Sequence, residues 1–130
     1  TMKPQSLDTI VATNLHADIL SDLAAALAGS IGVAPTANLN PERTSPSMFE
    51  PIHGSAFDIT GKGIANPVAT FWSASMMLDH LGETVAATRL MKAIEVITAN
   101  PDFHTPDLGG TATTDQVTAA IIDVIRARNH

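Results

Sequence analysis

At 130 residues the chain is long enough to bury a core, and its composition, 45% hydrophobic and 15% charged, is that of a globular protein. The formal net charge of −6 provides no basic footprint for nucleic acid, and the lack of cysteine excludes disulfides and thiolate metal sites. No apolar run is long enough to span a bilayer and no charged-then-apolar leader opens the chain, so we expect a cytoplasmic protein without a membrane partner.

The N-terminal third of the chain predicts a strand followed directly by a helix. Residues 1–7 are polar and typical of a tail or linker, whereas the β-branched residues 8–13 predict a short buried strand. A helix is expected over residues 14–28, ending before Gly29, with an apolar stripe of Ile19, Leu23 and Leu27. A weaker second strand is expected at residues 30–35, because a glycine interrupts it. Since ligands bind at the carboxyl edge of open α/β sheets, the first turns of this helix are candidates for a site.

Two carboxylates of the predicted helix, Asp18 and Asp22, are four residues apart and therefore share one face. No lysine or arginine occurs between Pro4 and Glu42 to neutralise them. A hard divalent cation such as Mg²⁺ or Mn²⁺ prefers oxygen ligands and would do so. From the spacing alone the alternative stays open that both aspartates only cap and solvate the start of a helix.

Residues 36–66 show no periodicity, contain three prolines and predict a fixed binding loop rather than regular structure. Apolar anchors argue against disorder; they are Met48, Phe49, Ile52, Phe57 and Ile59. The second half of this loop alternates glycines, which let backbone approach a ligand, with polar side chains that orient it. The Gly-x-Gly-x-x-Gly fingerprint of dinucleotide-binding folds is absent. Taken singly, His53, Asp58 and Asn66 are ordinary loop, turn and cap residues.

The remainder of the chain predicts three helices to which we assign structural roles. A heavily buried helix starts with Asn66 as cap, has proline at its first position and runs to about residue 81. A second helix is expected from the apolar stripe that runs over residues 86–97. The last helix opens with capping-box spacing at Thr113–Gln116, and Arg126 and Arg128 complement its dipole at the other end; residues 102–110 form a connection. Together these elements indicate an α/β protein of short strands and several packed helices.

Taken together, the motifs resemble those of the β-decarboxylating dehydrogenases, the family of isocitrate, isopropylmalate and tartrate or D-malate dehydrogenases. Residues 14–22 are similar to the family's Asn-Leu-x-Gly-Asp-Ile-x-Ser-Asp signature, although Ala17 replaces its glycine. Residues 50–67 are similar to its cofactor loop, with Phe57 where proline is common, and residues 107–110 match a segment before the final helix. The resemblance covers essentially the whole chain, corresponds to the C-terminal part of a family member, and is strongest to the tartrate and D-malate branch.

This resemblance implies an isopropylmalate dehydrogenase-like α/β fold that is incomplete in this chain. Residues 1–30 would be a strand and the metal-site helix of the family's second domain, and residues 31–130 the C-terminal part of its cofactor-binding domain. Asp18 and Asp22 would bind Mg²⁺ or Mn²⁺, with the site completed by the partner subunit of a homodimer. The resemblance implies that NAD is contacted by Glu50, His53, Gly54, Ser55, Ala56, Asp58 and Asn66. Among these, Asn66 would contact the adenine and Asp58 the adenosine ribose.

The implied activity is the NAD- and metal-dependent oxidation and decarboxylation of a malate-like 2-hydroxy acid, such as tartrate or D-malate. The family's catalytic lysine and tyrosine and its substrate-binding arginines would precede residue 1, and this chain contains no tyrosine. We therefore assign no catalytic residue here and expect the isolated chain to be inactive. The alternatives are an isopropylmalate dehydrogenase fragment, a module that binds cofactor and cation without turnover, and a structural core with idle inherited motifs.

Overall fold

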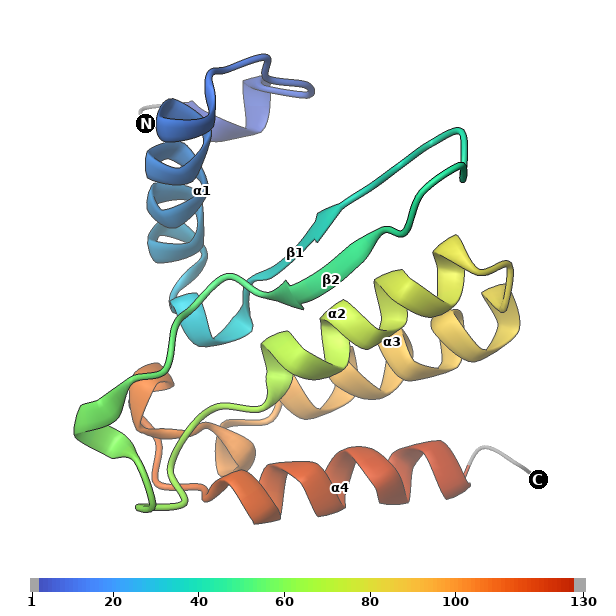
Figure 1. The fold of residues 1–130 in the computed structure, drawn as a ribbon. Helices are drawn as coiled ribbons and strands as arrows, with labels where there is room; N and C mark the ends of the chain where they lie inside the picture. The colour runs from blue at the N-terminus through green and yellow to red at the C-terminus, as the bar shows by residue number, and fades with distance from the viewer. Residues whose placement is uncertain (1–2, 128–130) are drawn as a thin grey trace.

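The computed structural model describes residues 3–127 as a helix standing apart, a two-stranded hairpin and three packed helices (Figure 1). In chain order the helices and strands are α1 (Asn14–Ala28), β1 (Pro35–Asn38), β2 (Met48–Pro51), α2 (Val68–His80), α3 (Thr84–Thr98) and α4 (Thr114–Ala127). Short 3-10 helices punctuate the connections: Pro4–Ser6, Ile31–Val33, Phe57–Ile59, Pro101–Phe103 and Pro106–Leu108. None of the helices within residues 3–127 is long and apolar enough to cross a membrane.

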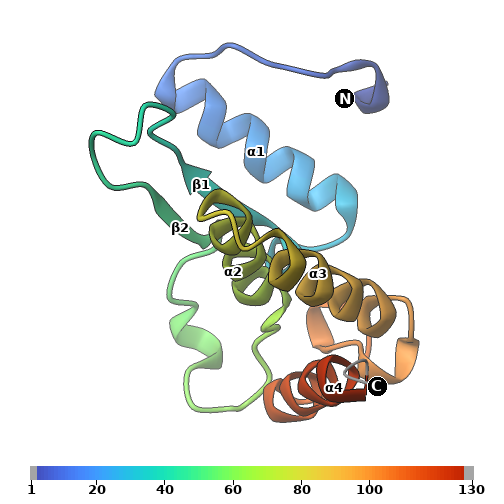
Figure 2. The same ribbon diagram turned by 90° about the vertical axis from the view of Figure 1, so that its right-hand side faces the viewer.

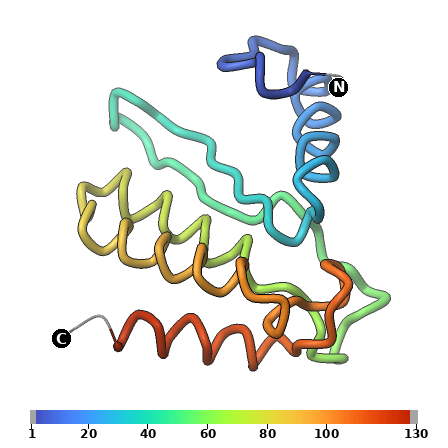
Figure 3. Tube along the Cα trace, turned by 180° about the vertical axis from the view of Figure 1, so that it is seen from behind, coloured from blue at the N-terminus to red at the C-terminus, as the bar shows by residue number. Residues whose placement is uncertain are grey.

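The core lies between the three C-terminal helices. α2 and α3 run antiparallel, and α4 returns along α3, as seen from behind in Figure 3. The buried cluster consists of Val68, Ala93, Ile94, Ile97, Ala112, Val117 and Ile121. The expected heavy burial of α2 holds on one face only, since Phe71 and Trp72 are partly buried and Met77 is 40% exposed. The loops at the left-hand end of the bundle in Figure 1 lead into α2 and connect α3 to α4.

The capping contacts predicted at two helix starts are present, but α2 begins at Val68, so Pro67 precedes its first position instead of occupying it. The Asn66 Oδ1 accepts a hydrogen bond from the Val68 N–H at 3.0 Å, so this side chain caps α2. In the predicted capping box the Thr113 N–H donates to the Gln116 side chain at 2.8 Å, and the Gln116 N–H donates to the Thr113 hydroxyl at 3.2 Å. Arg126 lies in the last turn of α4 as expected, whereas Arg128 lies outside the described residues.

The first half of the expected structureless loop is a β-hairpin, so that prediction was wrong. β1 and β2 pair antiparallel, with Pro35 opposite Pro51 and Asn38 opposite Met48, and they lie against α2. The tip of the hairpin contacts the end of α2, where the Arg43 guanidinium donates a hydrogen bond to the His80 carbonyl oxygen at 2.5 Å. This contact adds to the packing of both strands against α2, which places the hairpin on the helical bundle.

The N-terminal expectations are only half right. Residues 8–13 are exposed and irregular, and a 3-10 helix at Ile31–Val33 replaces most of the second expected strand. The β-branched run therefore has no strand partner within residues 3–127, and the start of α1 does not lie at the edge of a sheet. The helix prediction is confirmed, but its apolar stripe faces solvent (Ile19 56%, Leu23 38% and Leu27 55% exposed), with Ala25 the buried residue of α1. Figure 2 shows α1 separated from α2, α3 and α4 by the hairpin.

Candidate functional site

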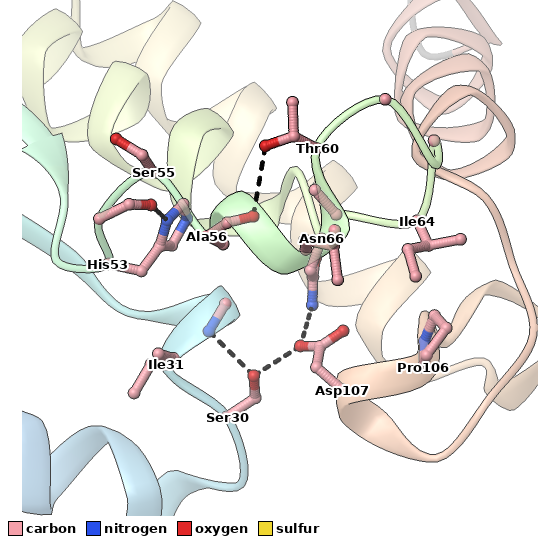
Figure 4. Close-up of a pocket in the computed structure, with 16 residues that line it drawn as sticks. Ser30, Ile31, His53, Ser55, Ala56, Thr60, Ile64, Asn66, Pro106 and Asp107 are labelled. Carbon is pink, nitrogen blue, oxygen red and sulfur yellow. Dashed lines mark hydrogen bonds between the residues drawn. The ribbon is translucent and has the colours of Figure 1, made fainter.

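A cleft of about 570 Å³ opens where three distant segments meet at the end of the helical bundle (Figure 4). One wall is formed by residues 30–32, which follow α1, and the opposite wall by residues 53–66, between β2 and α2. Pro106 and Asp107 close the third side. A cleft of this size lies in the range that holds small molecules and cofactors.

The loop of residues 53–66 has a defined backbone. Ala56 takes up a left-handed conformation (φ 44°), uncommon for a residue with a side chain, and the 3-10 helix Phe57–Ile59 follows it. At the far end of the loop, the Thr114 N–H donates to the Gly63 carbonyl oxygen at 2.9 Å. The Thr114 hydroxyl donates to the Ala65 carbonyl oxygen at 2.6 Å. The start of α4 thus pins the loop, and for this half of the segment the expectation of a fixed loop holds.

The structure brings together five of the seven residues predicted to contact a cofactor. The cleft is lined by His53, Gly54, Ser55, Ala56 and Asn66, and Figure 4 labels all of these except Gly54. The other two carry carboxylates: Glu50 lies exposed on β2, and Asp58 lies exposed in the 3-10 helix that follows Ala56 in the chain. Neither lines the cleft.

Asp107 is the carboxylate that the structure places at the cleft, and our sequence reasoning gave it no role. Its Oδ2 accepts hydrogen bonds from the Ser30 hydroxyl at 2.5 Å and from the Asn66 Nδ2 at 3.0 Å. Its Oδ1 accepts from the Thr105 hydroxyl at 2.5 Å. The signal available in the sequence was the family-like segment 107–110, whereas nothing marked Ser30 as its partner.

The hydrogen bonds of Asp107 favour its ionised form over its protonated form. Burial alone would raise the pKa of this carboxyl group, but the hydrogen bonds from Ser30, Thr105, Asn66 and its own backbone outweigh burial and lower its pKa from the ordinary value. The carboxylate form therefore persists to more acidic pH than that of a free aspartate.

Asp18 and Asp22 lie on α1, both exposed. Neither is in the first turn and no side chain caps the start of the helix, so they do not act as caps, but both are solvated as the alternative expects. Within residues 3–127 no cluster of three or more histidine or acidic side chains is able to hold a metal. Two carboxylates suit a hard cation that takes its other oxygens from water, substrate or another segment. The pair therefore fits part of a metal site.

The fold and the cleft define a class of protein. The isocitrate/isopropylmalate dehydrogenase family matches residues 1–125, and the chain therefore belongs to that family. A crystal structure of isocitrate dehydrogenase from Methylococcus capsulatus superimposes with a TM-score of 0.90 at 44% identity, over 96% of this chain and 37% of that one. The predicted fold class, a helix-rich part of an isopropylmalate dehydrogenase-like α/β fold, is confirmed.

Among relatives, a probable tartrate dehydrogenase/decarboxylase of Agrobacterium vitis is 74% identical over 99% of this chain and 36% of its own length. The decarboxylating D-malate dehydrogenase of Escherichia coli is 54% identical over 95% of this chain and 36% of its own length. The chain thus spans little more than a third of the relatives it matches. The predicted similarity to the tartrate and D-malate branch is confirmed.

Proposed function

We propose that this chain is the C-terminal part of an NAD-dependent, divalent-metal-dependent dehydrogenase that oxidises and decarboxylates tartrate or D-malate. The observation that carries the proposal is the cleft at residues 53–66, formed by a family-like cofactor loop in a chain 74% identical to a probable tartrate dehydrogenase/decarboxylase. The 54% identity to a decarboxylating D-malate dehydrogenase supports the same substrate class.

In this proposal the cleft binds the adenosine half of NAD. Three glycines of the loop (Gly54, Gly61 and Gly63) have open space where a side chain would stand, so backbone is accessible to a ligand. His53 is partly buried and Asn66 almost completely buried, which holds their polar groups at fixed positions in the wall. Ser55 and the left-handed Ala56 form the exposed rim of the cleft. The carboxylate of Asp58, two residues further along the chain, would accept hydrogen bonds from the ribose.

The metal site would be held by Asp18 and Asp22 together with ligands outside residues 3–127. When bound, the cation supplies electrostatic stabilisation of the hydroxy acid as it is oxidised and decarboxylated. The aspartates' own contribution is to fix two oxygen ligands on one face of a helix. Since α1 buries only Ala25, we assign residues 1–30 to a second domain, with Ser30 at the boundary and in contact with Asp107. The apolar face of α1 would contact the rest of the enzyme and the partner subunit of a homodimer.

The test uses the complete enzyme that carries these residues. We expect Mn²⁺-dependent NADH production from tartrate or D-malate, and an increase of at least about tenfold in the Mn²⁺ dissociation constant for Asp22→Asn, measured by calorimetry. Asp123→Asn, which changes an exposed carboxylate on α4, is the matched control and should bind Mn²⁺ as the parent does. Equal Mn²⁺ affinity for the parent and Asp22→Asn would remove Asp22 from the site. Failure to reduce NAD with either acid would refute the proposed function.

A further inference from the structure

One carboxylate ties together three segments that are far apart in sequence. Ser30, which donates to Asp107 at 2.5 Å, is 77 residues away, and Asn66, which donates to it at 3.0 Å, is 41 residues away. Figure 4 shows Ser30 and Asn66 approaching the same carboxylate from opposite walls of the cleft. Asp107 therefore bridges the two walls.

Both partners are also bound to the backbone of their own wall. The Ser30 hydroxyl accepts the Gly32 N–H at 2.9 Å, so it caps the 3-10 helix Ile31–Val33. The Asn66 side chain accepts the Val68 N–H at 3.0 Å at the start of α2. A continuous series of hydrogen bonds thus runs from one wall, through Asp107, to the first turn of the helix that supports the other.

The packing around this bridge leaves little freedom. A Cβ placed on Gly32 would lie 2.7 Å from the Asp107 Oδ2, 3.0 Å from the Asn66 Cβ and 3.1 Å from the Ser30 Oγ. A side chain at position 32 would thus displace the carboxylate or its partners. The absence of a side chain at Gly32 is what lets the two walls approach this closely.

Most acceptor sites of the carboxylate are occupied within the protein. An ionised carboxylate offers about four lone-pair sites, and Asp107 receives hydrogen bonds from the side chains of Ser30, Asn66 and Thr105. Little capacity is left for a ligand hydroxyl. Asp107 thus borders the cleft, but its hydrogen bonds are directed into the protein.

We infer that Asp107 is a positioning residue for the cleft: it fixes Asn66 and Ser30 so that the two walls keep the separation at which a ligand binds. That the ligand is NAD rests on the proposed function. Loss of the bridge should weaken NAD binding much more than turnover, because under the proposed function this cleft holds the adenosine half of NAD and not its reacting nicotinamide end.

The decisive variant is Asp107→Asn in the complete enzyme. It keeps the shape of the side chain but points an amide N–H₂ at donors that need an acceptor. We expect the NAD dissociation constant, measured by calorimetry, to rise about tenfold or more, while kcat at saturating NAD falls less than about threefold. Ser30→Ala, which removes one donor only, should give a smaller increase. Asp102→Asn changes an exposed carboxylate in the neighbouring 3-10 helix and should bind NAD as the parent does.

Hydrogen exchange of the ligand-free enzyme provides a second readout. Amides of residues 31–34 and 67–69 should exchange faster in Asp107→Asn than in the parent. In the double variant Asn66→Asp/Asp107→Asn the donor and the acceptor change places, and protection should return.

Unchanged NAD affinity in a folded Asp107→Asn enzyme would overturn the inference, as would equal loss of protection in the single and double variants. If the parent does not bind NAD, the proposed function fails. The hydrogen-exchange comparison then still decides whether Asp107 holds the walls together.

Discussion

At the scale of single residues, Asp58 should determine the choice between NAD and NADP. Its carboxylate is exposed in the 3-10 helix beside the cleft, where it would accept hydrogen bonds from a ribose 2′-hydroxyl and repel a 2′-phosphate. In the complete enzyme we expect Asp58→Ala to lower kcat/KM for NAD about tenfold and to narrow the gap to NADP.

The control for Asp58→Ala is Asp115→Ala, which removes an exposed carboxylate from the first turn of α4 and should leave the ratio unchanged. Lys62 is the sole lysine or arginine between Arg43 and Arg89 and would receive a 2′-phosphate. Any increase in kcat/KM for NADP that Asp58→Ala produces should therefore disappear in the double variant Asp58→Ala/Lys62→Ala. An unaltered NAD to NADP ratio in Asp58→Ala would show that this residue does not contact the ribose.

Residue-level prediction from sequence succeeded where the signal is local and failed where it is not. The contacts of Asn66 with Val68 and of Thr113 with Gln116 span two or three residues, so pattern alone found them. The bridge from Asp107 to Ser30 spans 77 residues, and no spacing rule reaches that far. His53 and Asn66, which only the family resemblance singled out, both line the cleft, and their contact with a cofactor stays a prediction.

At the scale of elements, the connection between α3 and α4 should be stable only with a glycine at position 110. A Cβ there would lie 2.0 Å from the His104 carbonyl oxygen and 2.6 Å from its carbonyl carbon, both backbone atoms that cannot turn aside. The same oxygen accepts the Ala112 N–H at 2.9 Å, so moving it would break a hydrogen bond. We expect Gly110→Ala to lower the free energy of unfolding by about 1–3 kcal/mol, measured by urea unfolding.

Gly54→Ala provides the comparison for Gly110→Ala. No heavy atom lies within 4 Å of the added Cβ, and the φ of Gly54 is not positive. Its free energy of unfolding should therefore remain within about 0.5 kcal/mol of the parent value. Equal stability of the parent and Gly110→Ala would mean that this connection adjusts its backbone without cost.

The elements themselves show which sequence signals are sufficient. Helices were predicted well because a repeated apolar spacing and local caps specify them, as at Asn14–Ala28 and Thr114–Ala127. The hairpin escaped notice because its strands are four residues long and begin or end with proline. The strand expected at residues 8–13 was wrong because β-branched residues favour a strand only where a partner and a packing surface are present.

At the scale of the whole molecule, α1 has an apolar surface with nothing to cover it within residues 3–127. The exposed fractions are 66% for Leu15, 56% for Ile19, 42% for Leu20 and 55% for Leu27, and Val11 just before the helix is 98% exposed. By contrast, the C-terminal helices bury a continuous cluster. Contiguous exposed apolar surface of this kind marks a contact with another part of a protein or with another chain.

We therefore expect the isolated 130-residue chain to associate with itself through α1. Sedimentation velocity over a series of concentrations should show the average mass rising above 13.6 kDa, because α1 faces of neighbouring chains remove each other's apolar side chains from water. Ile19→Lys/Leu27→Lys should shift the association to concentrations at least about tenfold higher. Val85→Lys/Val96→Lys, which replaces residues 80% and 43% exposed on α3, adds the same charge away from α1 and should associate like the parent. A parent chain that stays monomeric at every concentration would contradict this, as would equal effects of the α1 and α3 substitutions.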